Sequence, residues 1–186
     1  VGRADGVVVA FRVERRLDIA RNHTATHLLQ RALLQVLGDH VQQRGSLVTP
    51  DKLRFDFSHL TAMTAQEVES VEQAVNGYIR DCLPVSSVEL PYAEAVASGA
   101  IAIFDEKYGD TVRVLRVGNP PVSQELCGGT HVHNTGQIGL FALVSESSVG
   151  SGLRRIEAVT GREAEKYFKH NLRKLKQVEN LLDADS

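Results

Sequence analysis

Two short motifs bring together side chains that can bind a metal ion. HTATH places His23 and His27 four residues apart, and CGGTH places Cys127 and His131 at the same spacing. On a helix, residues four apart project from one face, so the two imidazoles can converge on a single ion. A metalloprotease helix needs a glutamate directly after its first histidine, and Thr24 occupies that position here. Taken alone, two histidines at this spacing are more often incidental than metal-binding, and a metalloprotease site is favoured even less.

The CGGTH motif offers a thiolate and an imidazole across a turn. Gly128 and Gly129 permit a tight fold in which Cys127 and His131 approach one ion. With the two helix nitrogens they form a tetrahedral donor set typical of zinc, whereas the alternative is a buried cysteine beside a surface histidine. Because four firm ligands would close a zinc site and catalysis needs an open position, we expect His131 to exchange with water or substrate.

Length and composition indicate an ordinary globular domain. The chain has 186 residues, of which 42% are hydrophobic and 24% charged, so it can bury a core. No apolar run approaches the roughly 18 residues of a membrane span, and no membrane partner is expected. The sequence starts without an initiator methionine or a secretory signal, which predicts a piece of a longer protein. Two cysteines are too few for a disulfide scaffold and favour a reducing, cytoplasmic setting.

The net charge of -2 is unevenly distributed along the chain. Residues 1–54 carry nine lysines and arginines against five acidic residues, and the remainder carries twelve against eighteen. A separate nucleic-acid-binding domain is usually more basic than this. If RNA is the partner, most phosphate contacts must lie outside this segment.

Periodicity places both motifs on defined elements. Apolar spacing predicts a helix over 14–37 that carries HTATH, a second helix begins at the capping box of Thr64 and Glu67, and a short one begins at Pro91. Strands are predicted over 7–13, 40–46, 53–57, 101–104, 111–117, 138–144 and 153–159, and a last helix over 162–182. This order predicts an α+β fold, in which an antiparallel sheet carries helices on one face and a long C-terminal helix follows.

The C-terminal helix is predicted to extend beyond the domain. Its apolar residues recur close to the spacing of a coiled-coil seam, at Phe168, Leu172, Leu175, Val178 and Leu182. Residues 162–176 also carry six basic residues against two acidic ones, which favours a position near RNA. We therefore expect 1–13 to be the tail of a preceding domain, 14–161 the central domain, and 162–186 a helix that leads to a further domain. The alternative is that this helix packs back on the sheet.

Five segments resemble the editing domain of alanyl-tRNA synthetases. They are RNHTATHLL (21–29), RFDF (54–57), ELCGGTH (125–131), NTGQIG (134–139) and GLRRIEAVTG (152–161). The likeness runs in order from about residue 12 to residue 161 and extends to the free-standing alanyl-tRNA deacylases. The related editing domain of threonyl-tRNA synthetases shares the paired histidines, but its turn typically reads Cys-Arg-Gly-Pro-His. The glycines of CGGTH favour the alanyl type.

The resemblance implies a proofreading hydrolase that removes wrongly attached amino acids from Ser-tRNA(Ala) and Gly-tRNA(Ala). It implies that Zn²⁺ is held by His23, His27, Cys127 and His131. The implied partners are the acceptor end of tRNA(Ala) and the rest of the synthetase chain, with scope for an oligomer through the C-terminal region of the full protein. Ligase activity is not expected of this segment, because it contains no ATP-binding signature.

The resemblance also associates Gln43 with editing. Its carboxamide can donate to and accept from a substrate hydroxyl, with Thr24 or Thr26 nearby, although helical threonines more often bond to their own backbone. Backbone amides in the glycine turn can donate to an oxyanion. The catalytic candidates are Gln43, Cys127, Thr24, Gly128 and Gly129. Two alternatives stay open, namely a free-standing deacylase and a zinc-stabilised tRNA-binding module without activity.

Overall fold

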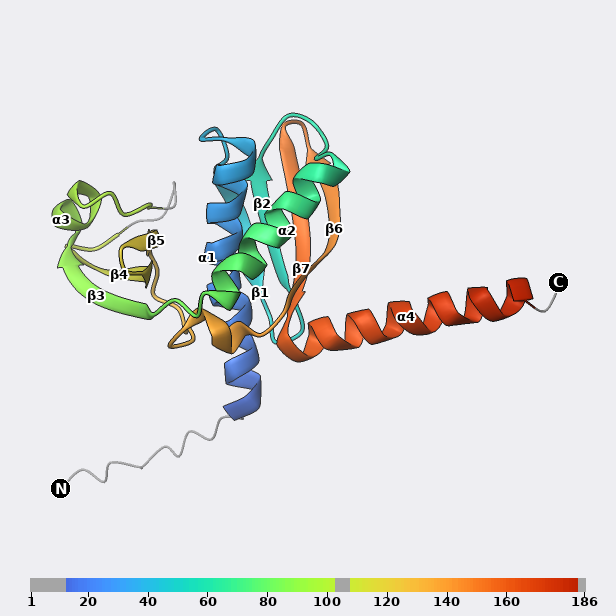
Figure 1. The fold of residues 1–186 in the computed structure, drawn as a ribbon. Coiled ribbons are helices and arrows are strands. Elements are labelled where there is room, and N and C mark those ends of the chain that lie inside the picture. The colour runs from blue at the N-terminus through green and yellow to red at the C-terminus, as the bar shows by residue number, and fades with distance from the viewer. Residues whose placement is uncertain (1–12, 103–107, 184–186) are drawn as a thin grey trace, which may run out of the picture.

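The computed structural model describes residues 13–102 and 108–183, which form helices and antiparallel sheets (Figure 1). The helices are α1 (Val13–Leu37), α2 (Ala65–Arg80), α3 (Tyr92–Ala97) and α4 (Gly161–Asp183), with a 3-10 turn η1 (Thr135–Ile138). The strands are β1 (Gln43–Val48), β2 (Leu53–Ser58), β3 (Val85–Pro91), β4 (Thr111–Gly118), β5 (Pro121–Leu126), β6 (Phe141–Gly150) and β7 (Leu153–Thr160). The predicted α+β class with a long C-terminal helix is confirmed.

The strands are divided between two sheets, whereas the sequence suggested one. One sheet has the order β1-β2-β7-β6 and the other has the order β3-β4-β5, with antiparallel pairing throughout both. The sequence analysis did not predict β3 or β5. Most of β3 is exposed, and β5 buries the polar side chains of Ser123 and Glu125, so neither strand shows the apolar alternation of a half-buried strand.

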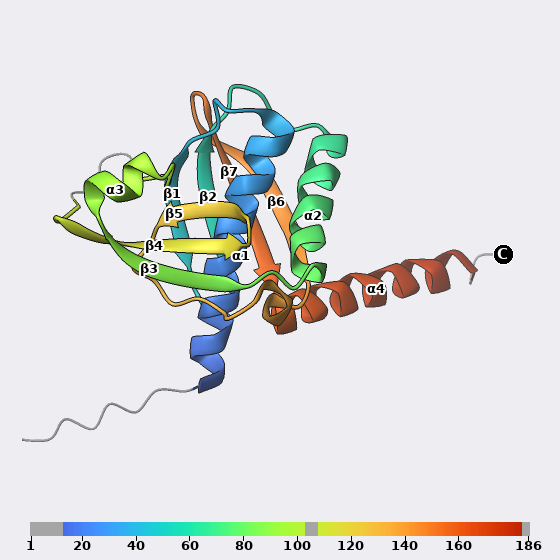
Figure 2. The ribbon, with the colours of Figure 1, turned by 60° about the vertical axis from the view of Figure 1, so that its left-hand side comes forward.

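Helix α1 lies between the two sheets (Figure 2). All residues from 24 to 30 are buried, so this part of the helix has no solvent-facing stripe. Leu28, Leu29 and Leu33 join the main core, to which β2 contributes Phe55 and Phe57. A smaller core lies at the three-stranded sheet and contains Ala95, Ala100, Val112, Val114 and Leu126. The HTATH motif is therefore held inside the domain by contacts on both sides.

Several predicted elements have the expected positions. Strand β2 alternates as predicted, with Leu53, Phe55 and Phe57 fully buried and the intervening residues partly exposed. The capping box of α2 is present, because the Thr64 hydroxyl accepts from the Glu67 amide and the Glu67 carboxylate accepts from the Thr64 amide. Local patterns sufficed for these elements because each depends on neighbours in sequence.

Other boundaries differ from the prediction. The strand predicted over 138–144 begins at Phe141, because the preceding residues form η1, and the strand predicted over 40–46 begins at Gln43. Ile101 forms only an isolated bridge with Glu125, and residues 103 and 104 of that predicted strand lie outside the described residues. The strand predicted over 7–13 also lies outside them, except that Val13 begins α1.

Helix α4 projects away from the sheets (Figure 1). Ala164 is fully buried at its start, whereas every residue from Phe168 to Leu182 is exposed. The apolar seam is exposed in the isolated chain, with Leu172 57% and Leu182 69% accessible. The division of the chain into three segments remains a prediction. Within residues 13–102 and 108–183, no helix is long and apolar enough to cross a membrane.

Removal of residues 169–186 is expected to leave the free energy of unfolding within about 0.5 kcal/mol of the full chain, because the described part of that segment is exposed. Truncation after Gly161 also removes the buried Ala164 and should cost about 1 kcal/mol more, while the domain stays folded. Urea denaturation of both truncated forms checks this. Collapse of the form that ends at Phe168 would show that α4 belongs to the core.

Candidate metal centre

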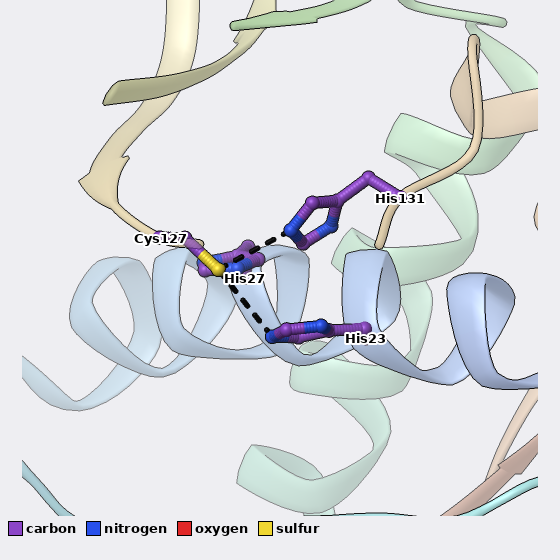
Figure 3. Close-up of side chains that lie close together, drawn as sticks. All are labelled: His23, His27, Cys127 and His131. Carbon is purple, nitrogen blue, oxygen red and sulfur yellow. Dashed lines mark hydrogen bonds between the residues drawn. The ribbon is translucent and has the colours of Figure 1, made fainter. Parts of the chain in front are cut away.

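Four side chains from two distant segments converge beside α1 (Figure 3). His23 and His27 project from the helix, and Cys127 and His131 come from the loop after β5. Their potential ligand atoms all lie within 4.8 Å of one another. The structure thus brings together the four residues that the two motifs singled out.

The Cys127 sulfur lies at the centre of this cluster. Its Sγ is 3.2 Å from His131 Nε2 and 3.5 Å from His23 Nε2 (Figure 3). The ring centroids of His23 and His131 are 4.4 Å apart, and those of His27 and His131 are 5.1 Å apart. One sulfur and three nitrogens this close together form a donor set of the kind that binds zinc in tetrahedral sites.

His27 supplies a direct test of whether a metal ion fits. Its Nδ1 lies 2.7 Å from Glu125 Oε2, which fixes the plane of the ring. Its Nε2 is buried and has no hydrogen-bond partner among the described residues. Buried polar atoms normally have partners, so an unpaired ring nitrogen in this cluster fits a metal ligand.

Electrostatics in the cluster favour a thiolate. Burial opposes ionisation of Cys127, but its contacts with His131, His23 and His27 outweigh burial and lower the pKa of the thiol to about 3. Burial also disfavours a charged His27, yet the charges of Glu125 and Cys127 raise the pKa of this imidazole to about 10. For His131, burial is the main cause of a pKa below the ordinary value. The thiolate is the form of cysteine that binds metals.

The turn that carries Cys127 is held close to α1. A Cβ added to Gly129 would lie 1.9 Å from Cε1 of His23, so glycine is required at this position. Arg113 of β4 donates to the carbonyl oxygens of Cys127 and Gly129, at 3.2 and 2.6 Å. Strand β4 therefore fixes the turn from one side while α1 limits it from the other.

A cavity of about 660 Å³ opens beside the cluster. His23, His27 and Cys127 line it together with Gln43 and the glycine turn. The first four residues of β1, which are Gln43, Arg44, Gly45 and Ser46, all line this cavity. A regular strand would direct alternate residues to opposite faces, and a bulge between Gln43 and Gly45 breaks that alternation.

The two threonines of HTATH differ in position. Thr26 lines the cavity, and its hydroxyl donates to the Asn22 carbonyl. Thr24 is fully buried and is not among the described residues that line the cavity. Its Oγ1 lies 3.2 Å from His131 Nδ1 and accepts from the Val132 amide. Thr24 therefore contacts His131 from outside the described lining of the cavity, and its catalytic role stays a prediction.

Sequence analysis missed Glu125 and Arg113. Both lie on strands, and their partners come from other elements, so no local spacing connects them with the motifs. The nearest signal was the acidic residue two positions before Cys127 in ELCGGTH. Away from this site, His40 Nε2 and His59 Nδ1 lie 2.8 Å apart.

The family model and the individual proteins that this chain resembles point to the same family. Residues 112–157 match the model of the threonyl and alanyl tRNA synthetase second additional domain. An alanine–tRNA ligase of Dehalococcoides mccartyi strain 195 is 63% identical over 171 residues, which covers 92% of this chain and 20% of that protein. Alanine–tRNA ligases of Thermotoga sp. strain RQ2 and Chlorobaculum tepidum are 54% and 56% identical over 182 residues. They match 98% and 96% of this chain and 21% and 20% of their own lengths.

The chain thus spans about a fifth of the length of the curated relatives it matches. The likeness covers both motifs and the elements that position them.

The two glycines of the turn offer a matched pair of substitutions. Gly129→Ala should weaken zinc binding by about 100-fold or more, because the new methyl group overlaps the His23 ring. Gly128→Ala should change zinc affinity less than threefold, since an added Cβ meets no described atom within 4 Å. Chelator competition on the purified variants measures both affinities. Equal losses at the two positions would show that the close approach to His23 does not control the site.

Proposed function

Because this chain belongs to the alanyl-tRNA synthetase family, of which it represents the segment with the second additional domain, we propose that it is a proofreading hydrolase. Its reaction is the hydrolysis of the ester that joins serine or glycine to tRNA(Ala). The observation that carries the proposal is the 660 Å³ cavity, which is lined by three members of the histidine–cysteine cluster and by Gln43. That volume lies within the range of small-molecule sites, which suits the aminoacylated end of a tRNA.

The donor set and the unpaired Nε2 of His27 support zinc as the cofactor. The ion would be held by His23, His27, Cys127 and His131. When bound, zinc would supply a positive charge that polarises a carbonyl oxygen or a water molecule, or that anchors the substrate's amino group. The protein's role is to hold these four side chains in place, which α1 and the Arg113-bound turn accomplish.

In the proposed reaction, a water oxygen bonds to the ester carbonyl carbon, and an oxyanion forms. The carbon–oxygen bond to the ribose then breaks, and the leaving ribose oxygen takes up a proton. Gly128 lines the cavity. The peptide bond that joins it to Cys127 has its carbonyl oxygen bonded to Arg113. No hydrogen bond that the structure describes uses the Gly128 N–H, so this donor is open to a molecule in the cavity. We assign this N–H as a donor to the oxyanion.

Gln43 is the proposed reader of the serine hydroxyl. The bulge in β1 places it at the cavity, where its carboxamide can both donate and accept. An apolar synthetic site rejects a substrate with one extra hydroxyl only about 100-fold, so serine needs a second site. A pocket that bonds the hydroxyl discriminates against alanine, whose binding would leave buried polar groups unpaired.

Incubation with Ser-tRNA(Ala), Gly-tRNA(Ala) and Ala-tRNA(Ala) tests the proposed activity. The protein should release serine and glycine, leave alanine attached, and lose activity when a chelator removes zinc. Restored zinc should restore hydrolysis, which controls for damage by the chelator. Tight tRNA binding without ester hydrolysis by the zinc-loaded protein would identify a binding module instead. Release of alanine as fast as serine would overturn the proofreading function.

Gln43→Ala should reduce kcat/KM for Ser-tRNA(Ala) by about 10- to 100-fold, because the serine hydroxyl loses its partner. The rate with Gly-tRNA(Ala) should change less, since glycine has no hydroxyl. Gln73→Ala is the matched control, because Gln73 lies on the exposed surface of α2 and bonds only to Glu69 among the interactions described. If Gln43→Ala slows serine and glycine release equally, then Gln43 does not read the hydroxyl.

A further inference from the structure

A buried chain of three polar side chains extends from His27 away from the metal centre. Ser123 donates from its hydroxyl to Glu125 Oε1 at 2.8 Å. Glu125 Oε2 lies 2.7 Å from His27 Nδ1. The three residues are only 5–7% exposed. These hydrogen bonds connect the interior face of β5 to the ring of His27, a candidate metal ligand.

Strand β5 positions Ser123 and Glu125. Ser123 and Glu125 are two residues apart, so both side chains project from the same face of the strand, toward α1. The backbone of this strand is fixed by Leu115 of β4, which pairs with Glu125, and by the bridge between Glu125 and Ile101. The carboxylate therefore approaches His27 from a strand that is anchored on both edges.

A buried carboxylate is costly unless it is paired and hydrogen-bonded. Glu125 meets this requirement with one bond to each oxygen. His27 Nε2 has no hydrogen-bond partner among the described residues. When the His27 ring is neutral, its Nδ1–H donates to Glu125 and its Nε2 lone pair faces the cluster. One ring nitrogen is then hydrogen-bonded and the other can bind a metal ion.

We propose that Glu125 is a positioning residue for the metal centre, with Ser123 as its support. By accepting from His27 Nδ1–H, the carboxylate selects the tautomer that presents Nε2 to the ion and prevents the ring from turning over. Ser123 holds the other oxygen and fixes the direction of the carboxylate. This inference rests on the metal site of the proposed function and assigns no step of the hydrolysis to Glu125.

Zinc affinity of the purified protein, measured by competition with a chromophoric chelator, tests the assignment without reference to tRNA. Glu125→Ala should weaken zinc binding by about 10- to 100-fold, the usual effect of losing a carboxylate behind a metal-bound histidine. Glu125→Gln should lose less, because the amide oxygen can still accept from Nδ1–H while its NH₂ donates to the Ser123 oxygen. Ser123→Ala should give a smaller loss in the same direction.

Glu146→Ala is the matched control. Glu146 is a largely buried carboxylate on β6 that pairs with Arg154 and contacts none of the four cluster residues among the interactions described. Its removal should leave zinc affinity unchanged. If Glu125→Ala and Glu146→Ala weaken zinc binding equally, the effect is a general loss of stability, and the assignment is wrong.

Nitrogen-15 NMR of the histidine rings gives a second readout. In the zinc-loaded wild type, His27 should carry its proton on Nδ1 and bind through Nε2, and the Nδ1–H signal should lose its downfield shift in Glu125→Ala. If Glu125→Ala does not fold, the same comparison is made with Glu125→Gln. Zinc affinity of folded Glu125→Ala within twofold of wild type, or binding of zinc through Nδ1 in the wild type, would overturn the inference. Reduced zinc affinity in variants of a protein without deacylase activity would support the inference and refute the proposed function.

Discussion

The site depends on one close approach, that of the 127–131 turn to helix α1. The two segments are about 100 residues apart in sequence, yet their ligand atoms must lie within 4.8 Å of one another. The limiting contact is Gly129 against His23, where no side chain larger than hydrogen fits. Sheet β3-β4-β5 carries the turn, and sheet β1-β2-β7-β6 supports the opposite side of α1. Each sheet thus supports one partner of this close contact.

Helix α1 is unusually polar for its position between the two sheets. A helix buried on both sides ordinarily carries apolar residues all round, whereas α1 buries Asn22, Thr24, Thr26, His27 and Gln30. Asn22 donates to Thr49 and accepts from Thr160, and so connects the helix to both β1–β2 and β7. Thr24 supports His131. These side chains position the helix and its ligands, and the leucines on the other positions supply the apolar burial.

How much the sequence could predict depends on the distance over which each feature is encoded. The four cluster residues were predictable because each pair lies within five residues, and β2 and α2 were predictable from alternation and capping. The role of Glu125 was not, because it requires knowing that β5 faces α1 across 98 residues of sequence. Strand β5 itself was missed because its inward residues include the polar Ser123 and Glu125, and Glu125 is paired with His27 of the distant helix α1.

The geometry bears on how a site with four protein ligands could act on a substrate. The sequence suggested that His131 would exchange, yet its Nδ1 lies against Thr24, and it is not among the described residues that line the cavity. A substrate that enters through the cavity meets Cys127, His23 and His27 first. Zinc in catalytic sites can expand from four ligands to five. A molecule in the cavity would therefore approach the side of the cluster formed by Cys127, His23 and His27, and His131 would keep its contact with Thr24.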